Sequence, residues 1–173
     1  TGCVAMAAGN QLVVGSTTAM SGAFFTDLFG SNTADIDVRA LLHGYNLMSW
    51  DHETGTYQIN DSVVAGMAVS RDAQNNRVYT FDLYGDLKFS DGSAITAKDY
   101  AFSILLTASP ELAKLGGQSA AVSAILGMDA YQSGKSSVLR GVRLLSDTQM
   151  SITISKDYEP YFYEMALFDY SPY

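Results

Sequence analysis

A strand, a tight turn and a capped helix follow one another directly near the middle of the sequence, and this order constrains the fold more than any other feature. In Val78–Tyr84 apolar and polar side chains alternate, which is the two-residue period of a half-buried strand. Asp91 and Gly92 then supply a turn. Thr96 begins a capping-box pattern, in which its hydroxyl accepts from a free backbone amide while Asp99 reaches back. The sequence therefore predicts an α/β (α+β) fold, with a mixed sheet, hairpins and packed helices.

Similar local patterns predict further elements on both sides of this segment. The polar residues Arg71–Arg77 lie between two strand-like runs and are suited to a hairpin. A helix is expected from Asp35 as N-cap, with an apolar face formed by Val38, Leu41, Leu42, Tyr45 and Met48. The other predicted elements are strands at Gln11–Thr17, Ala65–Ser70 and twice within Val142–Ile154, a turn at Asp51–Gly55, and helices from Pro110 to Gly116, over Gln118–Leu126 and from Glu159 to about Phe168.

Composition narrows the class of protein. The 173 residues are 47% hydrophobic, which is enough for one domain or most of one. Ten basic and eighteen acidic residues give a net charge of -8. An acidic chain lacks the clustered Lys and Arg that phosphate contacts need, so a nucleic-acid partner is not expected. No apolar run approaches the roughly 20 residues that span a bilayer.

The single cysteine, Cys3, lies close to the start of the sequence, and one cysteine excludes a disulfide within the chain. Thr1-Gly2-Cys3 is similar to the end of a bacterial lipoprotein signal, in which a small residue precedes the cysteine that is lipidated. Residues 1–10 are then a tether or the remnant of a lipobox, and this lipid is the only membrane association expected. The alternative is a cysteine that lies there by chance.

The loop after the first predicted strand is the candidate ligand site. Small polar residues beside aromatic ones, at the carboxyl end of a first strand, are where an α/β protein often places a ligand. The alternative is that the aromatic residues only fill the core. The candidate ligand-binding residues are Thr17, Thr18, Ser21, Gly22 and Phe24.

Catalytic and metal chemistry are poorly supported by the residues. The two histidines, His43 and His52, have no metal-ligand spacing, and no cysteine pairs with them. The sequence has no nucleophile elbow and no phosphate-binding glycine loop. Four acidic residues near the C-terminus are expected to be surface or helix-end charges rather than a glycosidase pair: Asp157, Glu159, Glu164 and Asp169. We therefore expect no catalytic residue, no metal site and no cofactor.

The order of these elements resembles that of a known family. Residues 77–103 read RVYTFDLYGDLKFSDGSAITAKDYAFS, and this segment looks like the signature of the family 5 solute-binding proteins. The resemblance covers an aromatic-Thr-Phe strand, the Lys-Phe-x-Asp-Gly turn at Lys88–Gly92, and the Thr-Ala-x-Asp helix start at Thr96–Asp99. Weaker similarity extends over about Leu12–Pro172, and it departs from the family pattern at Val63–Ala68.

The resemblance implies a fold and a function. Members of this family have two α/β lobes and hold the ligand in the cleft between them, so residues 11–173 are expected to form part of lobe I. The implied function is the substrate-binding component of an ABC importer, which captures peptides or other small solutes outside the cytoplasmic membrane and delivers them to permease subunits. The ligand could be an oligopeptide, a dipeptide, a nickel complex or a sugar. The alternative function is a carbohydrate- or surface-binding module that uses exposed tyrosines, with Tyr158, Tyr161 and Tyr163 as its candidates or else as core residues.

Overall fold

The computed structural model describes residues 13, 15–22, 28–29, 32–42, 44–117, 123–161 and 168–172. The chain divides into two compact units, Thr1–Leu42 and His43–Tyr173. The expected division between residues 10 and 11 lies outside the described residues.

The first unit contains one described helix, α1 (Thr33–Leu42). The sequence predicted Asp35 as the N-cap of this helix. In the structure the cap is Asn32. The Asn32 side chain accepts from the backbone N–H of Asp35 at 3.0 Å, and Asp35 accepts from the Asn32 N–H at 3.4 Å. This reciprocal pair places Asp35 in the first turn, where a carboxylate interacts favourably with the helix dipole. The helix ends at Leu42, so the predicted positions Tyr45 and Met48 are not part of it.

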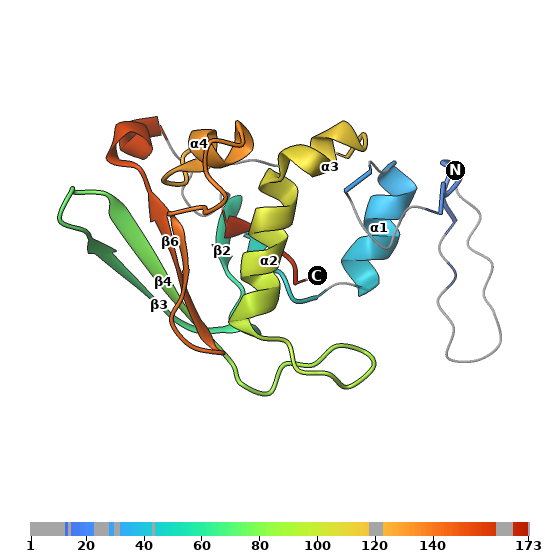
Figure 1. The fold of residues 1–173 in the computed structure, drawn as a ribbon. Helices are drawn as coiled ribbons and strands as arrows, with labels where there is room; N and C mark the ends of the chain where they lie inside the picture. Colours follow the sequence, from blue (N-terminus) through green and yellow to red (C-terminus); the bar gives the residue numbers. More distant parts are fainter. Residues whose placement is uncertain are drawn as a thin grey trace. The chain divides into compact units, whose positions relative to one another are not determined.

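The second unit is built on antiparallel strands (Figure 1). Its larger sheet has the order β3-β4-β6-β5, with β3 at Val64–Arg71, β4 at Arg77–Leu83, β6 at Gln149–Ile154 and β5 at Val142–Leu144. A separate hairpin pairs β1 (Met48–Asp51) with β2 (Thr56–Ile59). The predicted turn at Asp51–Gly55 is confirmed, and it connects these two strands.

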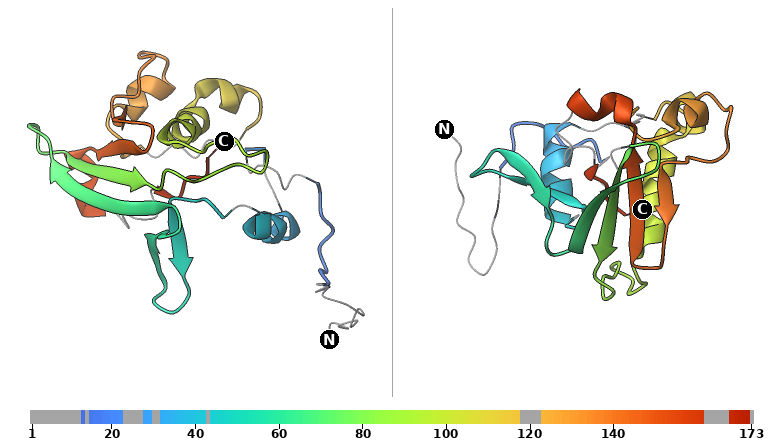
Figure 2. Two further views of the ribbon diagram at one scale, coloured as in Figure 1. Left: turned by 90° about the horizontal axis from the view of Figure 1, so that it is seen from below. Right: turned by 90° about the vertical axis from the view of Figure 1, so that its left-hand side faces the viewer.

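Helix α2 (Ala97–Ala108) lies along one face of the larger sheet (Figures 1 and 2). Its N-terminus has the predicted capping box: Thr96 accepts from the N–H of Lys98, and Asp99 accepts from the N–H of Thr96 at 2.7 Å. The short helices α3 (Pro110–Lys114) and α4 (Met128–Gln132) follow, and η1 (Lys156–Tyr161) is a 3-10 helix. Ser109 caps α3, and Pro110 occupies its first turn as expected.

The hydrophobic core lies between α2 and the larger sheet. Tyr79 and Phe81 of β4 are buried while Asp82 is exposed, so the predicted alternation is confirmed. Phe168 packs against both rings, with centroids 4.7 Å from Tyr79 and 5.3 Å from Phe81. From the helix side the core receives Tyr100 and Ile104, and from β6 it receives Met150 and Ile152.

Three predicted elements differ from the structure. In the segment predicted as a helix over 118–126, the described residues 123–126 form turns and a β-bridge, because their backbone bonds to the end of β6 through Leu126 N–H to Thr153 O. Instead of an α-helix from Glu159, a 3-10 helix begins at Lys156. Around the strand predicted over 11–17, the described residues 13 and 15–17 are not in a strand.

Candidate functional site

The predicted ligand loop is described from residue 15 to residue 22, and it presents uncharged polar groups. Thr17, Thr18, Ser21 and Gly22 are all exposed. Ser16 organises the loop, since its hydroxyl accepts from the N–H of Thr18 at 3.2 Å and donates to the Thr18 carbonyl at 3.1 Å. The fifth candidate, Phe24, lies outside the described residues.

Asp35 anchors the loop to the first turn of α1. Its carboxylate accepts hydrogen bonds from the hydroxyl of Ser21 at 2.5 Å and from the Ser21 N–H at 3.1 Å. The Asn32 side chain adds a second link by donating to the carbonyl of Ala19 at 2.9 Å. The Ser21 hydroxyl, followed by the amides of Asn32, Ser21 and Gly22, lowers the pKa of Asp35 below its ordinary value, against the opposing effect of burial. Asp35 therefore stays ionised, and its carboxylate serves to hold the loop in place.

The conformation of the loop limits what can replace Gly22. Its φ of +87° lies in the left-handed region that glycine enters without steric cost. The hydroxyls of Thr17 and Thr18 make no hydrogen bond to other residues in the described part of the chain. The two exposed hydroxyls, on a loop that is held in place at Ser21, are suited to hydrogen-bonding a neutral ligand backbone. Of the predicted ligand residues, the structure thus brings Thr17, Thr18, Ser21 and Gly22 onto one loop.

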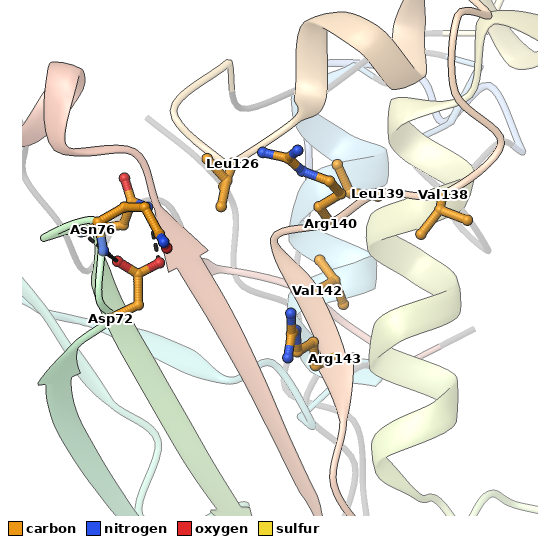
Figure 3. A pocket seen from close by; sticks show the side chains of 9 residues that line it. Asp72, Asn76, Leu126, Val138, Leu139, Arg140, Val142 and Arg143 are labelled. Atoms are coloured by element: carbon orange, nitrogen blue, oxygen red, sulfur yellow. Dashed lines mark hydrogen bonds between the residues drawn. The ribbon is translucent and has the colours of Figure 1, made fainter.

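Described residues of the second unit line two pockets that the sequence did not predict. The larger has a volume of about 580 Å³ and lies between the β3–β4 connection and the segment that leads into β5 (Figure 3). Its lining residues are Asp72, Gln74, Asn76, Leu126, Val138, Leu139, Arg140, Val142 and Arg143. The smaller has a volume of about 300 Å³ and shares Leu126 with it. The sequence signal that could have indicated the larger pocket is the Arg-Gly-Val-Arg run at 140–143, whose two arginines flank a strand start.

The candidates for sugar binding, catalysis, metal binding and lipidation are either described at separate places in the structure or lie outside the described residues. Tyr158 is half-buried; it packs against the core and also lines the smaller pocket. Asp169 is exposed and accepts a hydrogen bond from the Asn46 side chain at 2.7 Å. His52 is exposed in the turn between β1 and β2. Cys3, His43, Tyr163 and Glu164 lie outside the described residues, and so do the side chains of Glu159 and Tyr161.

No group of three or more His, Cys, Asp or Glu among the described residues is arranged to hold a metal ion. None of the helices in these same ranges has the length and apolar character needed to cross a membrane.

Comparison with known proteins gives a family match and several relatives. Residues 62–173 match the model of the bacterial extracellular solute-binding proteins, family 5 middle. The chain is 33% identical over 101 residues to the periplasmic oligopeptide-binding protein OppA of Escherichia coli K12. The aligned region covers 58% of this chain and 18% of that protein. It is 28% identical over 138 residues to a dipeptide-binding protein of Lactococcus lactis subsp. cremoris, covering 76% and 24%. The chain thus spans less than a quarter of the length of these two relatives.

Solved structures share the fold. A periplasmic oligopeptide-binding protein from Borrelia burgdorferi superposes with a TM-score of 0.60 at 26% identity, covering 82% of this chain and 27% of that one. Listeria monocytogenes OppA bound to peptide superposes with a TM-score of 0.58 at 24% identity, covering 79% and 26%.

Proposed function

The chain belongs to the bacterial extracellular solute-binding proteins of family 5, and from this premise we propose that it is part of the substrate-binding component of an ABC importer. In this role the protein captures peptides or related small solutes outside the cytoplasmic membrane and delivers them to permease subunits. The observation that carries the proposal is the family match over residues 62–173, because this range contains most of the second unit and its sheet.

Two expectations from the sequence are confirmed by these similarities. The family that the segment 77–103 resembles is the one whose model matches. The α/β (α+β) fold, as part of a bilobed solute-binding architecture, agrees with the oligopeptide-binding proteins that superpose on the chain. The alternative of a carbohydrate- or surface-binding module is not favoured, since the relatives are named for oligopeptide and dipeptide binding.

We propose the loop at 17–24 as the part of this chain that contacts the ligand, through Thr17, Thr18, Ser21, Gly22 and Phe24. Peptides are commonly held by hydrogen bonds to their backbone, with pockets for alternate side chains. The exposed and uncharged surface of residues 17–22, together with the attachment of Ser21 to Asp35, supports this assignment. A loop fixed before binding loses less conformational entropy when the ligand arrives.

Family 5 is a family of solute-binding proteins and not of enzymes. We propose that this protein likewise releases its ligand unchanged and needs no cofactor. Mass spectrometry of peptides recovered after long incubation with the protein tests this point. Peptide fragments that are absent from a protein-free control would overturn it.

The family is extracellular, and the Escherichia coli relative is periplasmic, so an extracytoplasmic location is indicated. We propose further that residues 1–10 are a tether and that Cys3 carries a lipid, which makes the protein a cell-surface lipoprotein or a lipid-anchored periplasmic protein. Metabolic labelling with a fatty-acid probe should mark the protein and fail to mark its Cys3→Ala variant. Equal labelling of both proteins would exclude Cys3 as the site.

Calorimetry on the complete protein that contains this chain tests the main proposal. We expect saturable binding of short peptides from a library that varies length and side chains. Thr17→Ala and Thr18→Ala should each weaken binding by about three- to tenfold, the loss expected for one hydrogen bond. Ser90→Ala removes an exposed hydroxyl from a turn in the second unit and is the matched control. The absence of binding across the library would overturn the proposed substrate class.

A further inference from the structure

The larger pocket of the second unit has two walls of different character. On one side, Asp72 and Asn76 come from the connection between β3 and β4; on the other, Arg140 precedes β5 and Arg143 lies within it (Figure 3). Its volume of about 580 Å³ lies within the range of 300–1,000 Å³ that is common for small-molecule sites. The pocket is therefore large enough for an amino-acid-sized ligand.

The polar atoms of the first wall are already used within the protein. The carboxylate of Asp72 accepts from the N–H groups of Gln74 and Asn76, each at 2.9 Å, and from the Asn76 side-chain amide at 2.8 Å. The side-chain oxygen of Asn76 in turn accepts from the N–H of Lys156 at 3.1 Å. Asn76 is only 5% exposed. This wall is a fixed structural unit with little hydrogen-bonding capacity left for a ligand.

The second wall has the opposite property. Arg140 and Arg143 are both exposed, and neither guanidinium group makes a hydrogen bond or an ion pair within the described part of the chain. The charge of Arg143 acts on Asp72 of the opposite wall, whose pKa it helps to lower. A guanidinium group carries five N–H donors in a planar fork that matches a carboxylate. These are two of only ten basic residues in a chain whose net charge is -8. Together with Asp72, the two arginines give the lining of the pocket a net charge of +1, whereas the whole chain is acidic.

Apolar side chains complete the pocket beside the two guanidinium groups. They are Leu126, Val138, Leu139 and Val142. Small-molecule sites typically combine an apolar lining with a few polar groups that fix the orientation of the ligand. We propose that this pocket is a second binding site, which takes a small carboxylate with an apolar body, such as the C-terminal residue of a peptide, through Arg140 and Arg143.

This inference does not rest on the proposed transport function, because the pocket lies in the second unit and the proposed ligand loop lies in the first. Experiments can therefore overturn the proposed ligand loop and the proposed second site independently of each other. Loss of peptide binding on changing Thr17 or Thr18 would leave the pocket untouched, and loss of binding in the pocket would leave the loop untouched.

Amide chemical shifts of the complete protein that contains this chain, titrated with N-acetyl-leucine, test the site directly. The probe carries a carboxylate and a leucine side chain, and N-acetyl-leucinamide is the matched probe without the charge. We expect saturable shifts at residues 72–76 and 138–143 with the acid and much weaker ones with the amide. Equal shifts with both probes, or shifts that are not confined to these residues, would overturn the proposal.

Variants separate the guanidinium groups from general charge. Arg140→Gln and Arg143→Gln should each weaken binding of the acid by about tenfold or more, as expected for one charge-assisted hydrogen bond. Lys88→Gln removes one charge at an exposed position outside the pocket and should change affinity by less than about twofold. Arg143→Lys keeps the charge but not the fork, and its affinity should fall between those of the wild type and Arg143→Gln. Wild-type affinity in both arginine-to-glutamine variants would overturn the site.

Discussion

Ser21 donates both its backbone N–H and its hydroxyl to the carboxylate of Asp35, fourteen residues further along the chain. One side chain in the first turn of a helix thus determines where the end of the candidate ligand loop lies. The same carboxylate accepts from the N–H of Asn32, so loop position and helix capping depend on one group. A change at Asp35 should therefore disturb the loop and the helix start together.

Asp35→Asn should loosen this connection without unfolding the helix. An amide offers one acceptor oxygen in place of two, and the charge is lost, so the hydrogen bonds from Ser21 cannot all be kept. We expect hydrogen exchange at the amides of Ser21 and Asn32 to become about two- to tenfold faster, as for loss of one hydrogen bond.

The control for this change is Asp37→Asn, because Asp37 is exposed on the same helix and its side chain makes no hydrogen bond in the described part of the chain. It should leave both exchange rates unaltered. If Asp35→Asn left the exchange of Ser21 at the wild-type rate, the anchoring role of Asp35 would be wrong.

The capping box of α2 should contribute measurably to stability. Thr96→Ala removes the acceptor for the N–H of Lys98 and the hydroxyl that donates to Asp99 at 2.9 Å. We expect the free energy of unfolding to fall by about 1 kcal/mol in urea titrations. Thr96→Ser keeps the hydroxyl and should retain most of the stability. Equal losses in the two variants would mean that the methyl group, and not the cap, matters.

Local patterns in the sequence predicted the parts of the fold that local chemistry decides. The alternation in β4, the Thr96–Asp99 cap and the turn at Asp51–Gly55 all depend on neighbours a few residues apart, and all three are confirmed. The helix predicted from Asp35 is present, but its N-cap lies three residues earlier than predicted. Asn32 and Asp35 are both good caps by type, and only the geometry of the chain selects between them.

Features formed by distant segments were not predictable in this way. Residues 125 and 126 pair with β6 and do not form the predicted helix, and nothing in their own sequence encodes that partner. The larger pocket joins the connection after β3 to the segment before β5, so its residues become neighbours only when the sheet forms. For the candidate loop, residue types indicated the position but not Asp35, because its role as an anchor is a tertiary contact.

Phe168 should be essential to the core of the second unit. It is fully buried and contacts both Tyr79 and Phe81 of the central strand β4. Phe168→Ala removes these contacts and leaves a cavity, so we expect the free energy of unfolding to fall by about 3–5 kcal/mol. That is a large part of the roughly 5–15 kcal/mol that a typical domain has.

Phe102→Ala is the matched control, because Phe102 is 51% exposed on α2. Its effect should stay within about 0.5–1 kcal/mol. Urea unfolding followed by circular dichroism measures both variants. A loss at Phe168 no larger than that at Phe102 would contradict the position of Phe168 in the core.

Stability should decrease in acid, and Asp72 should contribute to that decrease. The Asn76 side chain, then the amides of Asn76 and Gln74 and the charge of Arg143, lower the pKa of Asp72 from its ordinary 3.8, against the opposing effect of burial. Because the pKa is lower in the folded state, the stabilisation is fully present well above pH 3.8 and is lost as the pH falls through the folded-state pKa. Urea midpoints should thus change little from pH 7 to pH 5 through this group and fall towards pH 3.

Asp72→Asn should have a lower midpoint at pH 7 and a shallower fall between pH 5 and pH 3. Asp86→Asn removes an exposed carboxylate that makes no hydrogen bond in the described part of the chain, and it should follow the wild-type curve. A curve for Asp72→Asn as steep as that of the wild type would show that the hydrogen bonds from Asn76 and Gln74 do not favour the ionised form.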